Sequence, residues 1–326
     1  MSVELVEVVR SGFRECVHRG SLIVLDPAGE VVVSLGEVHT PIYPRSSNKP
    51  LQAVALLRAG FVPRDSAELA IATASHEGET EHVEAVQRLL DGAGFTETDL
   101  ACPADVPGNE RARAEVLASG GERRPVYMNC SGKHAAMLAA CAANGWDTAG
   151  YTDAGHPLQQ LVTETVLELA DDVEDTDLGV DGCGLPIVPM PLFNLARAYS
   201  RLVTAQPGTP ERAVADAVRE HPFLISGSGK DDLELMGAVD GLLCKAGADG
   251  IHAGALPNGT AFAFKIDDGH ERARLPLTAA LLQRLATSEL GHTATFDVER
   301  LAGLASQPVL GGGVRVGTVR AVPGVF

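Results

Sequence analysis

Apolar and polar residues alternate near both ends of this chain, whereas apolar residues recur every three or four positions in its middle. Three runs near the start, 3–9, 22–26 and 31–36, are β-rich, and Pro27-Ala28-Gly29 supplies a turn between the last two. The middle of the chain has the spacing of helices. The helices that this spacing predicts cover 48–59, 65–73, 80–91, 110–118, 132–143, 157–170, 192–203 and 210–219.

Strand character returns after the helical middle. Residues 251–266 predict a hairpin, because Asn258-Gly259 suits a tight turn with positive φ at both central residues. The segment before it, 244–250, predicts a turn into that hairpin. A helix is expected at about 275–287, and residues 313–322 alternate like a terminal strand.

This layout predicts an α/β fold in which strands from both chain ends form one antiparallel sheet, with a helical domain inserted between them. The helices at 48–59 and 275–287 are expected to cover the sheet. We place the sheet domain at 1–60 and 225–326, and the mainly helical domain at 61–224. A cleft between two such lobes is a natural site for a small molecule.

Composition and charge narrow the classes of function. The chain has 326 residues and a formal net charge of −17, which argues against nucleic acid and anionic membranes as partners. The first residues lack a basic segment followed by a long apolar core, and no segment has the length of a membrane span. We therefore expect a cytoplasmic protein. Its six cysteines are dispersed, so they are expected to be buried, metal-binding or catalytic rather than bridged.

The segment Tyr-Pro-Arg-Ser-Ser-Asn-Lys-Pro-Leu-Gln at 43–52 carries the first candidate chemistry. Ser46 and Lys49 are three residues apart at the start of a predicted helix, so both lie on one helix face. A lysine amine placed there can take the proton of the serine hydroxyl, as in serine amidohydrolases of the Ser-x-x-Lys type. The alternative is an N-cap serine followed by a solvated lysine.

A second hydroxyl occurs in Ala-Ser-His-Glu-Gly-Glu at 74–79, in a tight loop between two predicted helices. Ser75 there is able to relay a proton to a leaving group, or the loop is an ordinary helix–helix turn. Lys265 is the only charged residue of the apolar strand 261–266. It either protects a sheet edge from aggregation or faces the cleft.

Two cysteines lie on Gly-containing segments, Cys130 in Asn-Cys-Ser-Gly-Lys-His at 129–134 and Cys183 in Asp-Gly-Cys-Gly at 181–184. One interpretation is that the two thiols are half of the ligands of a zinc site, with Lys133 or His134 as a further ligand. The alternative is that both cysteines are buried and contribute only to packing of the core. Asp181 is a candidate to bind the α-ammonium group of an amino-acid substrate, and Arg45 its α-carboxylate; otherwise both form surface ion pairs.

Taken together, these motifs resemble the bacterial L-asparaginase II family of the Rhizobium-type (thermolabile, inducible) class. Each motif is weak alone, but the set follows the family's order over nearly the whole chain. The segments that carry the resemblance are 3–12, 18–21, 43–52, 74–79, 129–134, 181–186, 245–250 and 265–269.

The resemblance implies a homodimer with a fold like that of glutaminases and serine β-lactamases. It implies two Ser-Lys pairs, Ser46 with Lys49 and Ser75 with Lys265. It further implies a zinc ion and a set of residues around the substrate. By resemblance, the zinc ligands are Cys130, Lys133 and Cys183, and the residues around the substrate are His134, Asp181, Arg45 and Cys244.

We therefore expect an amidohydrolase that converts L-asparagine and water to L-aspartate and ammonia, with Ser46 as nucleophile and Lys49 as base. The roles of Ser46 and Ser75 can be exchanged. Three other interpretations stay open: a glutaminase or β-lactamase-like serine hydrolase, a catalytically silent amino-acid sensor, and a hydrolase in which Cys130 and Cys183 hold a catalytic metal.

Overall fold

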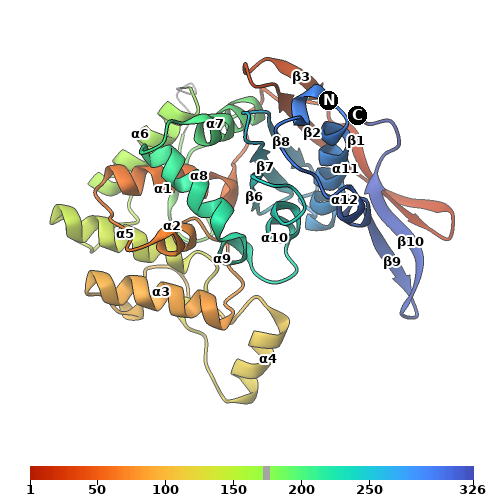
Figure 1. Ribbon diagram of the computed structural model, residues 1–326. Helices are drawn as coiled ribbons and strands as arrows, with labels where there is room; N and C mark the ends of the chain where they lie inside the picture. Colours follow the sequence, from red (N-terminus) through yellow and green to blue (C-terminus); the bar gives the residue numbers. More distant parts are fainter. Residues whose placement is uncertain (172–176) are drawn as a thin grey trace. The chain divides into compact units, whose positions relative to one another are not determined.

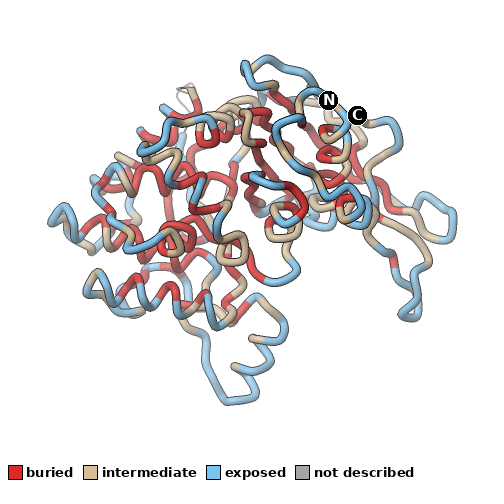
Figure 2. Tube along the Cα trace, in the orientation of Figure 1, coloured by how far each residue is buried: buried red, intermediate tan, exposed pale blue. Residues whose placement is uncertain are grey.

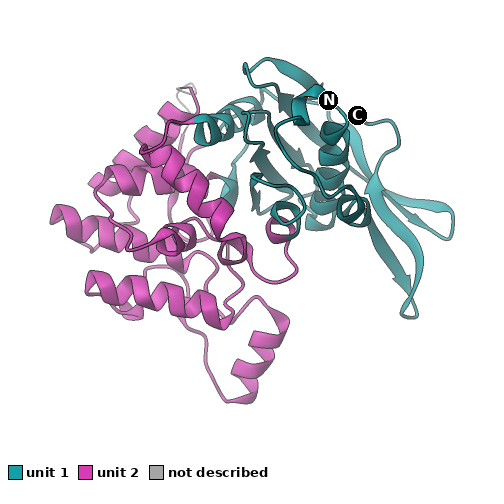
Figure 3. Ribbon diagram, viewed as in Figure 1, with its two compact units in different colours: residues 1–47, 190–204, 234–326 teal, residues 48–189, 205–233 magenta. Residues whose placement is uncertain are grey.

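The computed structural model describes residues 1–171 and 177–326, and these form two compact units. The first unit comprises residues 1–47, 190–204 and 234–326, and the second comprises 48–189 and 205–233 (Figure 3). The chain therefore passes from one unit to the other four times. No helix in the described ranges is both long and apolar enough to cross a bilayer.

The first unit is built on an antiparallel sheet with the strand order β6-β7-β8-β2-β1-β10-β9, in which β3 also pairs with β2 (Figure 1). Strands from both ends of the chain meet in it, because β1 pairs with β10 and β2 with β8. This confirms the expected sheet. The strands are β1 (Val3–Arg10), β2 (Phe13–Leu25), β3 (Val31–Leu35), β6 (Leu243–Gly247), β7 (Ile251–Ala255), β8 (Ala261–Ile266), β9 (Ser306–Gly311) and β10 (Val314–Ala321).

Both faces of the sheet centre are buried. Leu22 and Val24 of β2 share an apolar cluster with helix α11 (Arg274–Ala286). The alternate residues Ile23 and Leu25 are also fully buried, and successive strand residues point to opposite faces. Helix α7 (Leu192–Thr204) packs on β2, β7 and β8, and α12 (Val298–Leu304) packs against α11. Figure 2 shows this buried centre.

The helix expected at 48–59 forms, but it does not cover the sheet. It is α1 (Lys49–Arg58), which belongs to the second unit and packs on other helices there, while α7 lies on the sheet. The physical reason is the distribution of apolar residues. Helix α1 is buried all round from its first residue to Leu56, which suits the centre of a helical unit, whereas α7 buries one face.

The strands differ from the sequence-based expectation in several places: β4, β5 and β9 were not expected, and β6 and β2 have other bounds. The segment 244–250, expected as a turn, forms most of β6 before it turns. Strand β2 begins at Phe13, well before the expected residue 22, and its first three residues, Phe13, Arg14 and Glu15, are exposed. This half of β2 is paired with β1 alone, and its residues FRECVHR show no regular alternation of apolar and polar side chains that would predict a strand.

The second unit is mainly helical, as expected, and its core helices are α1, α2, α3 and α5, with α6 and α8 packed on α1. Its remaining elements are α2 (Ser66–Ala72), α3 (Thr80–Ala93), α4 (Glu110–Ala118), α5 (Ser131–Asn144), α6 (Pro157–Leu169), α8 (Pro210–Glu220), α9 (Pro222–Ser226), the start of α10 (Asp231–Met236), and the short strands β4 (Gly179–Val180) and β5 (Pro186–Ile187). Single 3-10 turns are η1 (Arg45–Asn48), η2 (Glu97–Asp99), η3 (Pro125–Tyr127), η4 (Glu271–Ala273) and η5 (Glu289–Gly291).

Helices α2 and α5 lie in close contact in this unit. A Cβ atom on Gly132, the second residue of α5, would lie 2.2 Å from the Ile71 carbonyl oxygen of α2. Only glycine fits there, so the start of α5 is held against the end of α2. The two loops that carry the candidate chemistry, after α2 and before α5, are thereby brought together.

Candidate active site

The lysine of the Ser-x-x-Lys segment is buried in the second unit. Turn η1 continues directly into α1, since Asn48 keeps helical backbone angles (φ −84°, ψ −5°). Lys49 is 1% exposed, and its Nζ donates to Ala74 O at 2.5 Å and to Ser75 Oγ at 2.9 Å. The amine thus lies against the second serine segment. Ser46 is half-buried in η1, three residues before Lys49, and its pairing with Lys49 stays a prediction.

Lys265 lies on β8 in the first unit, where its Nζ donates to the carbonyl oxygens of Asp249, at 2.7 Å, and Ile266. Its expected partner, Ser75, is in the second unit, so this pairing also stays a prediction. Burial lowers the pKa of the Lys265 amine, against the carboxylates of nearby aspartates that act to raise it. A lysine with a lowered pKa is suited to proton transfer.

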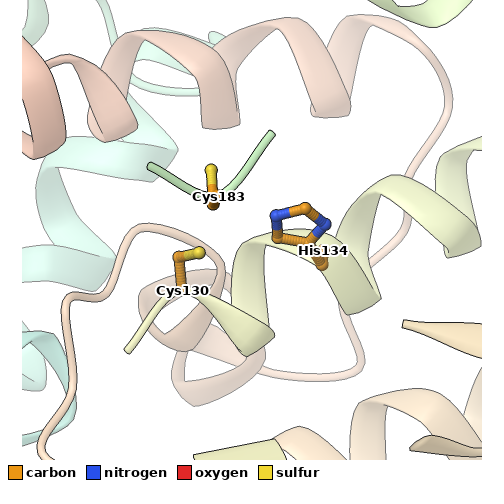
Figure 4. A group of neighbouring side chains, drawn as sticks. All are labelled: Cys130, His134 and Cys183. Carbon is orange, nitrogen blue, oxygen red and sulfur yellow. The ribbon is translucent and has the colours of Figure 1, made fainter. Parts of the chain in front are cut away.

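The cysteine segments meet in the second unit, as Figure 4 shows. Cys130 is the N-cap of α5, His134 is in the first turn of that helix, and Cys183 is on the loop between β4 and β5. Their potential ligand atoms all lie within 4.8 Å of one another, and all three residues are buried. Lys133 Nζ donates to Cys183 Sγ at 3.6 Å.

The Cys183 loop is a tight turn at its base. The Asp181 N–H donates to Leu185 O at 2.9 Å, and the Gly184 N–H donates to Asp181 O at 2.9 Å. Gly184 has a φ of +86°, which glycine adopts without strain. The turn therefore fixes the position of Cys183 relative to Lys133.

The charges of this cluster shift the pKa values of Cys183 and Lys133 in opposite directions. Hydrogen bonding with Cys130 and the charge of Lys133 hold the pKa of the Cys183 thiol well below its usual value. Burial acts to lower the pKa of Lys133, but Cys183, Cys130 and Asp181 outweigh it, so that pKa is raised. Asp181, expected to bind a substrate ammonium group, is thus a charge partner of Lys133 in this structure.

His134 fits a metal ligand. Its Nδ1 is hydrogen-bonded to the Tyr151 hydroxyl at 2.7 Å, so Nε2 is the nitrogen left for another partner. That Nε2 is buried, and the ring also interacts with the Cys183 thiol. Burial lowers the pKa of His134, which favours the neutral imidazole that metals bind.

Two thiols and an imidazole are donors suited to zinc, and the Lys133 amine beside them would become a donor only on losing its proton. The residues present therefore fit the expected ion, with His134 added to the ligands expected from the sequence: Cys130, Lys133 and Cys183. The sequence did not indicate Tyr151, because a single tyrosine outside a motif carries no local signal. Its role depends on a contact with His134, 17 residues away.

The other two expected site residues lie in the first unit. Arg45 has a φ of +50° and forms an ion pair with Asp249. Cys244 is on β6 and is fully buried in the apolar cluster of the sheet. Their expected contact with substrate stays a prediction.

Some solved structures are similar to this chain at low sequence identity. Similar solved structures include a beta-lactamase from Mycobacterium bovis, which is 14% identical with a TM-score of 0.44 over 82% of this chain and 93% of that one. Another is an octameric penicillin-binding protein homologue from Pyrococcus abyssi, 12% identical with a TM-score of 0.43 over 94% of this chain and 84% of that one. No curated protein matches the sequence significantly.

A family model gives the decisive match. The model described as L-asparaginase II matches residues 6–321 and so includes every candidate site residue. This agrees with the resemblance found in the sequence motifs. The chain belongs to the L-asparaginase II family and is a hydrolase.

Proposed function

We propose that this protein hydrolyses the side-chain amide of L-asparagine by serine–lysine nucleophilic catalysis. The observation that carries the proposal is the 2.9 Å contact between the buried Lys49 Nζ and Ser75 Oγ. A buried amine against a hydroxyl is the arrangement that activates a serine without a histidine. Membership of the L-asparaginase II family supports the choice of substrate.

In the proposed reaction, a serine Oγ attacks the amide carbon and its proton passes to neutral Lys49 Nζ. With one N–H held by Ala74 O, the neutral amine keeps a lone pair for that proton. The tetrahedral intermediate then loses its C–N bond, and the proton is delivered to the departing nitrogen, which leaves as ammonia. Water attacks the resulting ester, which releases L-aspartate and restores the hydroxyl.

The observed hydrogen bond joins Lys49 to Ser75, and Ser46 precedes Lys49 by three residues in turn η1. We propose that Ser46 is the nucleophile and that Ser75 relays the proton to ammonia, with Lys265 as the partner of Ser75. The hydrogen bond between Lys49 and Ser75 equally supports the exchange of these roles. Substitution of each serine separates the two assignments.

We also propose that zinc binds Cys130 and Cys183, with Lys133 and His134 as the further ligands. A bound zinc ion would supply a positive charge that orients and polarises a polar group of the substrate. The protein's own part is to hold the two thiols, the amine and the imidazole together at the start of α5 and to exclude water from them. Lys133 would have to lose its proton to bind the metal.

The test is ammonia release from L-asparagine and L-glutamine by the wild type and by Ser46→Ala, Ser75→Ala and Lys49→Met. Loss of the nucleophile or the base is expected to lower kcat by about 10²- to 10⁴-fold or more. A burst of ammonia before steady state, retained only in the serine variant that spares the nucleophile, identifies that residue.

Ser47→Ala is the matched control. The Ser47 hydroxyl is adjacent in sequence but donates to Pro44 O at 2.6 Å, so its loss is expected to affect stability rather than kcat. Activity of both Ser46→Ala and Lys49→Met within threefold of wild type would contradict the mechanism. Faster turnover of L-glutamine than of L-asparagine would replace the proposed substrate by its homologue.

A further inference from the structure

The loop that carries Ser75 is tied to neighbouring elements by its own backbone. The Ser75 N–H donates to Ile225 O at 2.8 Å, and the next residue, His76, donates from its N–H to Asn129 O at 3.0 Å. Ile225 is at the end of α9, and Asn129 directly precedes Cys130. The Ser75 loop is thus attached to the segment that begins α5.

The side chain of His76 makes a second attachment to the same place. It is 1% exposed, and its Nδ1 accepts the Gly78 N–H at 3.1 Å. The proton of the neutral ring is therefore on Nε2, which donates to Ser131 Oγ at 2.9 Å. Ser131 is the first residue of α5, and its hydroxyl donates onward to Val126 O at 2.9 Å. Every hydrogen-bonding atom of the His76 ring is therefore engaged.

A second histidine, His82, packs against the ring of His76. The His82 ring stacks on His76 with centroids 5.3 Å apart, and on Phe223 at 4.6 Å. His82 Nδ1 accepts the Glu79 N–H at 3.2 Å, so its Nε2 donates to Phe223 O at 3.0 Å. The imidazole of His76 has no freedom to turn, and the loop residues 75–79 are held at both ends.

From this network we propose that His76 is a positioning residue that fixes Ser75 against Lys49, and that it does so through its hydrogen bond to Ser131 at the start of α5. Ser131 directly follows Cys130, so the same bond holds the Ser-Lys pair in register with the cluster of Cys130, Lys133, His134 and Cys183. This deepens the proposed function and rests on it for any effect on turnover. The predicted rigidity of the loop does not depend on the reaction.

Hydrogen exchange tests the structural part without any substrate. Ser131→Ala removes the acceptor for His76 Nε2 and leaves the imidazole in place. We expect the backbone amides of residues 75–79 to exchange at least fivefold faster, as measured by mass spectrometry, while a peptide from α6 is unchanged. Equal exchange at 75–79 in the wild type and in Ser131→Ala overturns the proposal.

Turnover tests whether the placement of Ser75 by His76 affects catalysis. Ser131→Ala and His76→Ala are each expected to lower kcat at least tenfold with KM changed less than threefold, because the serine is misplaced while the substrate still binds. The double variant should be no slower than His76→Ala alone, since both changes break one bond. His76→Gln, whose amide N–H reaches toward Ser131, should recover part of the lost kcat.

Thr73→Val is the matched control. The buried hydroxyl of Thr73 donates to Ala70 O at 2.8 Å. The substitution therefore removes a buried hydrogen bond two residues from Ser75 and leaves the His76–Ser131 hydrogen bond intact. Thr73→Val is expected to keep wild-type kcat and exchange at 75–79.

The two proposals fail in different ways. If the wild type releases no ammonia from either amide, yet Ser131→Ala speeds exchange at 75–79, the proposed function is wrong and the positioning role of His76 stands. If the wild type is active and Ser131→Ala changes neither kcat nor exchange, His76 does not position Ser75. Equal losses of kcat in Thr73→Val and Ser131→Ala also overturn the positioning role of His76, because the loss of any nearby buried hydroxyl would then have the same effect.

Discussion

The amine of Lys49 is buried, although lysine is rarely fully buried in proteins. A buried polar group is retained where it is hydrogen-bonded, and Ala74 O and Ser75 Oγ provide the acceptors here. Both acceptors come from the loop after α2 rather than from the Ser-x-x-Lys segment itself. The local pattern predicted the lysine, and another element supplied its observed partner.

The cysteine cluster leads to a prediction about metal binding. Metal-free protein is expected to bind one zinc ion per chain, measured by calorimetry and by metal analysis after dialysis. Cys183→Ser is expected to weaken zinc binding by about 100-fold or more, because it replaces a thiolate ligand by a hydroxyl, which binds zinc poorly. The surroundings of Cys183 lower the pKa of its thiol, which favours the thiolate form that metals bind.

Cys141→Ala is the control for this prediction, since Cys141 is a buried cysteine of the same helix, α5, and is not part of the cluster. It should leave zinc affinity unchanged. An equal loss of affinity in Cys141→Ala and Cys183→Ser, or no zinc binding by the wild type, would contradict the proposed ligands.

At the level of elements, the contact between α2 and α5 aligns the two halves of the site. Helix α2 leads into Ser75, and α5 begins next to Cys130, so a shift of either helix changes the distance between the Ser-Lys pair and the cysteine cluster. Gly132 permits the contact, because any side chain there would meet the backbone of Ile71. Backbone cannot move aside as a flexible side chain does.

Gly132→Ala is therefore expected to lower the free energy of unfolding by about 1–3 kcal/mol or more, because an added methyl in a packed contact forces the helices apart. Denaturant unfolding measures this, and kcat should fall as well. The comparison is Gly303→Ala in α12, where a Cβ atom meets nothing within 4 Å. That change should stabilise the protein by about 0.4–1 kcal/mol. Equal effects of the two substitutions would contradict the role of the close contact.

At the scale of the whole molecule, neither unit is one continuous piece of chain. The sheet takes strands from both ends, and α7 belongs to it although helical segments precede and follow it in sequence. Strands β1 and β2 depend on β10 and β8 for partners, and those strands arise only after residue 260. Folding of the first unit must therefore wait for the last part of the chain.

A fragment of residues 1–233 is expected not to fold cooperatively. It contains the whole second unit, but β1 and β2 would have unpaired edges and α7 would expose its apolar face. Near-ultraviolet circular dichroism and size-exclusion chromatography should show lost packing and aggregation. Addition of residues 234–326 should restore the native spectrum if the missing strands are the cause. Cooperative unfolding of 1–233 alone at the full-length Tm would refute this.

The sequence by itself determined most helices and strands and the residue types of the site. Helix bounds at 110–118 match α4, and other predicted helices agree within about two residues, because the 3.6-residue apolar period is a local property. The candidate residues Ser46, Lys49, Ser75, Cys130 and Cys183 were identified from short motifs, which are local as well. The family resemblance is confirmed by the model that matches residues 6–321.

Only the tertiary structure decided which elements meet. Lys49 reaches Ser75 across 26 positions of sequence, His134 joins the cysteines while Tyr151 holds its ring, and α7 rather than α1 covers the sheet. These contacts depend on close packing between segments far apart in the chain, such as the approach of α5 to α2 at Gly132. A periodic pattern specifies which face of an element is buried, but it does not specify what buries it.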